Sequence, residues 1–236
     1  MEKITYDLVR SGRKTIELRI LADGTVQVRA PSKVPKQEID RFVDSKQSWI
    51  ETHRAAQRSR QPAAVAPRTI LYKGQWYTIG ENDRGALYFD GSAFTAPKGI
   101  DDDALRASLP GLMHKLAKQV LVPQVYATAK EMQLNPARVT ITGAKTKWGS
   151  CSGVRVTQNG STVTPAVGQN ISLSWRLIAA PPDAIHYVIV HELCHMRELN
   201  HSPAFWAWVE RYVPDWRAQK EKLAEVQTWL EAYYGR

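Results

Sequence analysis

The sequence has 236 residues, of which 43% are hydrophobic and 23% are charged, and its formal net charge is +9. No apolar run approaches the roughly 20 residues of a membrane-spanning helix, which excludes a membrane span, and the start MEKITYDLVRSG lacks the features of a secretory signal. Two cysteines, Cys151 and Cys194, are too few for a disulfide framework. We therefore expect a globular cytoplasmic protein with reduced thiols.

The first hundred residues predict mainly β-structure. The runs KTIELRI and VQVRAP flank an ADG turn and predict a hairpin, and apolar residues at helical spacing after Pro35 predict a short helix. The Pro-punctuated residues 58–67 predict a linker or a long surface connection. Two further β-rich runs, residues 69–79 and 85–97, follow. Residues 1–98 are thus expected to form a mainly β N-terminal region.

The next segment predicts helix and then strands. The acidic DDD from Asp101 suits the positive end of a helix dipole, and the helical pattern runs to about Leu134. Pro110 and Pro123 lie inside it and predict separate helical pieces or a kink, because proline lacks the amide hydrogen of an interior helical residue. Residues 153–175 predict strands around a Gly, Asn and Ser-rich excursion.

Three helices are predicted in the C-terminal part. The first begins at PPDAIHYVIV and ends at Asn200, which tolerates a left-handed cap. Ser202 followed by Pro203 predicts the N-cap of the second helix, and the third covers residues 216–234. Together these elements predict an α+β protein whose residues 99–236 form a helical domain with a small sheet.

The stretch HELCH carries the chemistry. His191 and His195 are four residues apart, so on a helix they lie about 40° apart and one turn apart along the axis. Two imidazoles at this spacing can bind one metal ion, and Glu192 is close enough to face a ligand of that ion without binding the ion itself. A catalytic zinc site needs a third protein ligand besides water.

The third ligand has several candidates. His201 is the best of them, because it follows the expected helix stop and precedes the next N-cap. The acidic alternatives are Glu198 and Glu210. Cys194 lies one residue before His195 and therefore points about 100° away from it.

These residues resemble the YgjP-like family of zinc metallopeptidases, which is akin to the SprT-like and WLM zincins. The resemblance rests on KWGSCS at 147–152, on residues 171–206 around HELCH, and on the N-terminal KTIELRI and VQVRAP. It implies a zincin-like metallopeptidase domain over residues 99–236, with His191, His195 and His201 as zinc ligands and Glu192 as general base. The segment of residues 154–169 is longer than the short turn that the resemblance leads us to expect at this place. It predicts a substrate-shaping flap or only a longer hairpin.

If zinc binds at this site, we expect hydrolysis of a peptide or protein substrate. A zinc-bound water would attack the carbonyl, and Glu192 would take the proton of that water. NISLSW, residues 170–175, is the expected edge strand that aligns an extended peptide. Further candidate substrate-binding residues are Lys145, Lys147, Trp148 and Ser172.

Two other functions use the same site. A metal-dependent nucleotide pyrophosphatase or phosphoester hydrolase, for example on UTP, fits the basic charge but lacks a Gly-rich phosphate loop. A nucleic-acid-associated protease is the other, since most of the positive charge lies in residues 1–70 and a basic surface attracts polyanions.

Overall fold

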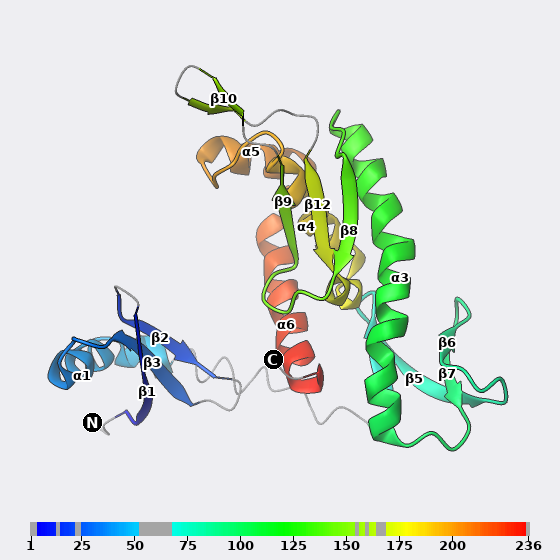
Figure 1. Cartoon of the computed structure of the whole chain (residues 1–236), viewed down its shortest axis with the longest axis horizontal. Coiled ribbons are helices and arrows are strands. Elements are labelled where there is room, and N and C mark those ends of the chain that lie inside the picture. The colour runs from blue at the N-terminus through cyan, green and yellow to red at the C-terminus, as the bar shows by residue number, and fades with distance from the viewer. Residues whose placement is uncertain are drawn as a thin grey trace. The chain divides into compact units, whose positions relative to one another are not determined.

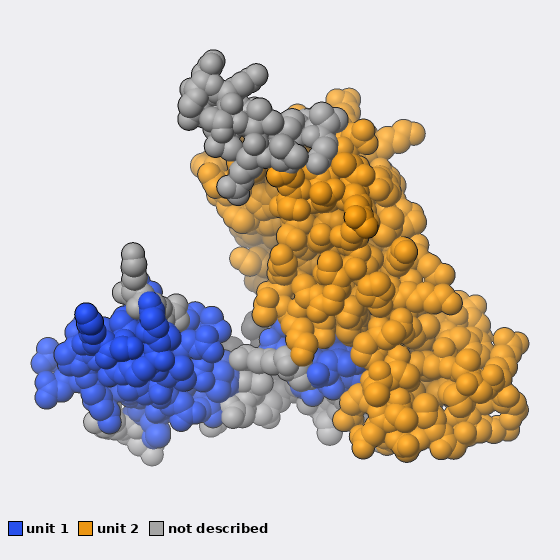
Figure 2. All heavy atoms as spheres, in the orientation of Figure 1, with its two compact units in different colours: residues 1–63, 227–236 blue, residues 64–226 orange. Residues whose placement is uncertain are grey.

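The structure is a computed structural model that describes residues 4–12, 15–21, 25–51, 68–153, 156–158, 161–163 and 169–234. Its residues form two compact units (Figure 2), one of residues 1–63 with 227–236 and the other of residues 64–226. The element order is mixed α+β, as the sequence predicts.

The N-terminal part of the first unit is a three-stranded sheet with a short helix. Its strands are β1 (Tyr6–Ser11), β2 (Glu17–Ile20) and β3 (Val26–Pro31), in the order β1-β3-β2, and its helix is α1 (Lys36–Asp44). β2 pairs antiparallel with β3, which confirms the predicted hairpin, and β1 runs parallel to β3. Alternate residues of β3 are buried and form a core with one side of the helical segment.

The second unit begins with a four-stranded sheet. It comprises β4 (Thr69–Tyr72), β5 (Gln75–Asn82), β6 (Tyr88–Phe89) and β7 (Phe94–Pro97), in the order β4-β5-β7-β6. In the β4–β5 turn, the N–H of Gly74 donates to the carbonyl of Ala179. Gly74 has a φ of 76°, and a Cβ there would lie 2.9 Å from Pro181. The turn therefore needs glycine and contacts the segment that precedes the helix beginning at Pro182.

Helix α3 (Asp102–Glu131) is one continuous helix (Figure 1), capped by the Asp101 side chain, which accepts from the Ala104 N–H. The sequence predicted separate helical pieces or a kink at Pro110 and Pro123, and the first of these alternatives is wrong. Each proline costs a helix about 3 kcal/mol, whereas each fully buried leucine contributes about 1.5–3 kcal/mol. α3 buries nine residues along its length, and this packing outweighs both prolines.

The sheet that carries the site has three strands. These are β8 (Arg138–Thr142), β9 (Gly149–Ser152) and β12 (Asn170–Ser174), in the order β8-β12-β9. β12 runs parallel to β8 and antiparallel to β9. The prediction that NISLSW is an edge strand is wrong, because β12 is the central strand. In the described part of the chain, β9 pairs with β12 alone and is an edge strand, as is β8.

Between β9 and β12 lie two short strands, β10 (Val156–Gln158) and β11 (Ser161–Val163), which pair antiparallel as a hairpin. After β12, the 3-10 helix η1 (Trp175–Ala179) leads into α4 (Pro182–Cys194). α4 contacts β9, and α3 contacts β8 and η1.

The last helices are α5 (Pro203–Tyr212) and α6 (Trp216–Tyr234). The Ser202 hydroxyl accepts from the Phe205 N–H at 3.2 Å, which confirms the predicted N-cap. α4 ends at Cys194 instead of Asn200, and Asn200 is not among the described residues with positive φ. Among the described residues, no helix is long and apolar enough to cross a membrane.

Candidate active site

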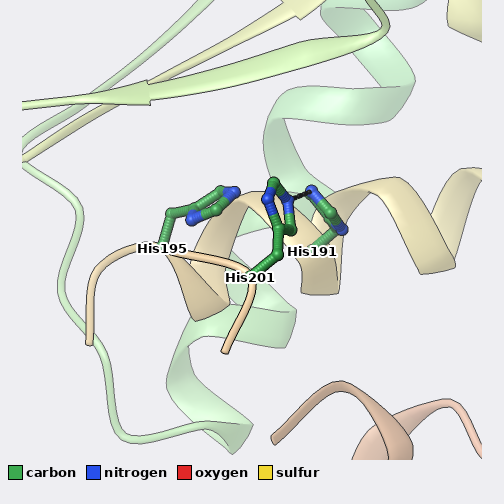
Figure 3. Close-up of side chains that lie close together, drawn as sticks. All are labelled: His191, His195 and His201. Atoms are coloured by element: carbon green, nitrogen blue, oxygen red, sulfur yellow. Dashed lines mark hydrogen bonds between the residues drawn. The ribbon is translucent and has the colours of Figure 1, made fainter. Parts of the chain in front are cut away.

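Helix α4 carries His191 and Glu192, and His195 is its C-cap residue. His195 keeps right-handed helical dihedral angles, so the two histidines retain the one-turn spacing of a helix. Nearly every side of α4 is buried, which fixes the direction in which its polar side chains point. Figure 3 shows the imidazoles of His191 and His195 projecting from the same stretch of this helix.

His201 reaches the same point from the loop between α4 and α5 (Figure 3). Its Nε2 lies 3.1 Å from Nε2 of His191, and one potential ligand atom from each of the three histidines lies within 4.8 Å of the others. Nitrogen ligands of a tetrahedral zinc ion lie about 3.3 Å apart, given bonds of about 2.0–2.1 Å. The separation of His191 and His201 is close to this value, and all three imidazoles converge to within 4.8 Å.

The acidic alternatives for the third ligand lie elsewhere. Glu198 contributes its backbone carbonyl, which is 3.0 Å from Nδ1 of His195, and the Glu210 carboxylate accepts from Arg217 and Trp216. Among the described residues, the group that could hold a metal ion consists of the three histidines. It contains neither of these carboxylates, and it does not contain Cys194.

The environment of the imidazoles fits a divalent metal ion. The Glu198 carbonyl holds Nδ1 of His195 and leaves Nε2 for a ligand bond, as is usual for metal-binding histidines. Nδ1 of His191 is buried without a hydrogen-bond partner in the described part of the chain. Three imidazoles without a carboxylate among them suit a borderline ion such as Zn²⁺ better than Mg²⁺ or Ca²⁺.

Burial keeps two of the imidazoles neutral. It lowers the pKa of His191 to about 3, with further lowering from His195, His201 and Lys220. Burial also lowers the pKa of His195, against the opposing effect of the Glu198 carbonyl. Neutral imidazoles present the free lone pairs that metal binding requires.

Glu192 lies beside this group and is only 7% exposed. Burial raises the pKa of its carboxyl group from 4.5 to about 7, while Lys147 and the N–H of Cys151 act in the opposite direction. A carboxyl group that titrates near neutral pH is suited to accept and return a proton.

A cavity of about 720 Å³ opens onto these side chains. Its lining includes residues 149–153, which are β9 and the residue after it, and Leu199 and Asn200 of the loop between α4 and α5. Within it, the Cys151 thiol donates to the Gln169 carboxamide at 3.0 Å, and burial raises the pKa of that thiol to about 12. Cys151 is therefore a neutral thiol.

The four candidate substrate-binding residues do not line this cavity. Lys145 and Lys147 are exposed and Trp148 is half-buried. The Ser172 hydroxyl is 2.9 Å from that of Thr140. Ser172 alternates along β12 with the buried Ile171 and Leu173, which pair with residues of β9 that line the cavity. Ser172 therefore lies on the opposite face of the sheet from those β9 residues.

The sequence analysis used β9 residues for the family resemblance, as part of KWGSCS, but gave none of them a place in the site. Nothing in HELCH identifies the strand that packs against it. The run of small residues in GSCSG next to a strand pattern was an available signal, since such residues let other groups approach the backbone closely.

Glu192 is expected to destabilise the metal-free protein. A carboxyl group with a raised pKa in the folded state binds protons more tightly when folded, so stability falls as pH rises from 4.5 to about 7. One pKa unit corresponds to about 1.4 kcal/mol, so at pH 8 Glu192→Gln should raise the free energy of unfolding by up to about 3 kcal/mol.

The measurement is denaturant unfolding of both chelated proteins between pH 4 and pH 8. The gain should disappear below about pH 4.5. A difference between the two proteins that does not change with pH would contradict this explanation.

A buried helix presents two histidines and a glutamate, and a third histidine is folded back onto them, so this group could hold a metal ion. The chain belongs to the YgjP-like family, whose metallopeptidase-domain model matches residues 14–226. Comparisons with curated proteins and with solved structures return no match. Membership of a metallopeptidase family implies a metal ion and a peptide or protein substrate.

Proposed function

We propose that the protein is a zinc metallopeptidase in which His191, His195 and His201 bind the zinc ion and Glu192 is the general base. The observation that carries the proposal is the convergence of the three imidazoles within 4.8 Å beside a glutamate that is 7% exposed. Each part of this set is needed for metal-assisted hydrolysis: a ligand group, a nearby base and an open cavity.

The residues divide the work of the reaction. A bound zinc ion would polarise the scissile carbonyl and make water acidic enough to lose a proton near neutral pH. Glu192 takes that proton and passes it on to the leaving amine. The Glu198 carbonyl keeps His195 in the orientation that leaves Nε2 free.

Strand β9 is suited to hold the substrate. One side of β9 pairs with β12, and its residues Gly149 to Ser152 border the cavity next to Glu192. An extended peptide can add to such an edge by main-chain hydrogen bonds, which bring its carbonyl to the site without selecting its side chains. β9 thus takes the role that the sequence assigned to NISLSW.

The phosphoester alternative has one observation in its favour. Lys147 is close enough to lower the pKa of Glu192, so a cation acts on the site. However, among the residues that the structure describes, the side chains that line the cavity include no lysine or arginine, and phosphate groups need such cations or a metal clamp. This lining favours a peptide over a nucleotide such as UTP.

The test compares both substrate classes with one protein preparation. Purified protein is incubated with denatured casein or with UTP, each in the presence of Zn²⁺ or of a chelator. We expect chelator-sensitive cleavage of casein and no release of pyrophosphate. Chelator-sensitive pyrophosphate release without casein cleavage would contradict the proposal.

Trp206 is expected to hold His201 in place for the metal. The Trp206 ring is stacked on the His201 ring at a centroid distance of 5.7 Å and on the Trp216 ring at 4.0 Å. Partners that orient a ligand typically change metal affinity by about 10- to 100-fold. Trp206→Ala should therefore weaken zinc binding by about that factor, measured by competition with a chromogenic chelator.

Trp208→Ala is the matched control, because Trp208 lies on the same helix and stacks on Tyr212. It should keep the affinity of the unaltered protein. Equal affinities for both variants would show that the Trp206 ring does not support His201.

A further inference from the structure

Strand β9 and helix α4 approach each other at Gly149, where the strand contributes no side chain. A Cβ atom at Gly149 would lie 2.6, 2.7 and 2.8 Å from Cγ, Oε1 and Cδ of Glu192. Carbon atoms in favourable contact are about 3.5–4.0 Å apart. The Glu192 side chain therefore occupies the space that a side chain at position 149 would need.

The same strand holds the end of the Glu192 side chain. The N–H of Cys151 donates to the carboxylate, and Cys151 lies two residues from Gly149, on the same face of β9. These two residues pair with Leu173 and Ile171, which are both fully buried. Glu192 thus lies against a rigid sheet, with one hydrogen bond to its carboxylate and close contact along its stem.

Backbone conformation does not explain this glycine. Gly149 is a strand residue and is not among the described glycines with positive φ. Alanine could adopt the same backbone without strain. The three heavy atoms nearest to an added Cβ all belong to Glu192, so the requirement at position 149 is for space next to that side chain.

We propose that Gly149 is a positioning residue for Glu192, and that the absence of a side chain there sets the place of the carboxylate. The inference rests on the proposed role of Glu192 as general base. A base must come within about 2.6–3.2 Å of the proton that it takes, and a misplacement of about 1 Å can cost about 10²-fold in rate. Relief of the contact with an added Cβ requires a displacement of about that size.

Gly149→Ala should therefore lower kcat for peptide hydrolysis by about 100-fold. KM and zinc affinity should stay within about threefold, because no histidine is among the atoms nearest to the added Cβ. The matched control is Gly80→Ala in strand β5, where an added Cβ would lie 3.6 Å from Thr95, an ordinary contact. Gly80→Ala should keep kcat.

A double-mutant cycle tests the contact itself. Melting temperatures are measured for Gly149→Ala, for Glu192→Ala and for the double variant. Gly149→Ala alone should lower the melting temperature, whereas the double variant should melt at the temperature of Glu192→Ala, because the clashing side chain is gone. If Gly149→Ala fails to fold, recovery of folding in the double variant supports the same conclusion.

Two results would overturn the inference: an unchanged kcat in Gly149→Ala, or an equal loss of stability from Gly149→Ala with and without Glu192. The activity of Glu192→Gln distinguishes failure of this inference from failure of the proposed function. If Glu192→Gln is inactive while Gly149→Ala is fully active, Glu192 remains the base and the positioning role is lost. If Glu192→Gln keeps its activity, the proposed function itself is wrong.

Discussion

Glu192→Gln is expected to lower kcat for peptide hydrolysis by about 10³-fold while zinc remains bound. The amide keeps the shape of the glutamate side chain but cannot accept a proton, and positioned general bases contribute about 10²- to 10⁴-fold to such reactions. The histidine ligands are untouched, so the zinc content by elemental analysis should equal that of the unaltered protein. The rate is measured with denatured casein or a fluorogenic peptide.

Glu198→Gln is the control, because the part of Glu198 that contacts the site is its backbone carbonyl. Its activity should stay within about twofold of that of the unaltered protein. Full activity in Glu192→Gln, or an equal loss in both variants, would remove Glu192 from the mechanism.

His195→Ala is expected to abolish stoichiometric zinc binding and, with it, hydrolysis. Loss of a supporting hydrogen bond alone typically costs about 10- to 100-fold in metal affinity, so the loss of one of three ligands should cost more. The reduction should therefore exceed about 100-fold, measured by competition with a chelator of known affinity.

His186→Ala is the matched histidine control. His186 lies on the same helix, but the metal-binding group of the described residues does not include it. Zinc affinity should be unchanged in this variant. If His195→Ala binds zinc as tightly as His186→Ala does, His195 is not a ligand.

The local signals in the sequence predicted most of the elements of the fold. Turn chemistry at ADG predicted the β2–β3 hairpin, and Ser202 before Pro203 predicted the start of α5. These signals succeed because a turn or a cap depends on neighbouring residues alone. The division into residues 1–98 and a metallopeptidase domain of residues 99–236 stays a prediction.

The errors arose where distant residues decide the outcome. α3 continues through Pro110 and Pro123 because its buried face packs against other elements, and helix propensity does not contain that term. NISLSW was placed at a sheet edge, but it lies between β8 and β9. Strand order is a property of the whole domain, so the hydrophobic pattern of one strand cannot reveal it.

The candidate site shows the same division. The positions of His191 and Glu192 on one helix follow from helix geometry, and the structure brings His201 to them through the loop after α4. The contact of Glu192 with Gly149 joins two segments about 40 residues apart and involves a residue with no side chain. Only a three-dimensional structure reveals that contact.

The central claim is that His191, His195 and His201 bind one zinc ion. The most direct measurement is anomalous diffraction from crystals of the native protein, with data collected on both sides of the zinc absorption edge. The expected result is one zinc peak at about 2.0–2.1 Å from a nitrogen atom of each of the three imidazoles. A zinc peak at another place in the protein, or no peak between these rings in crystals that contain zinc, would contradict the claim.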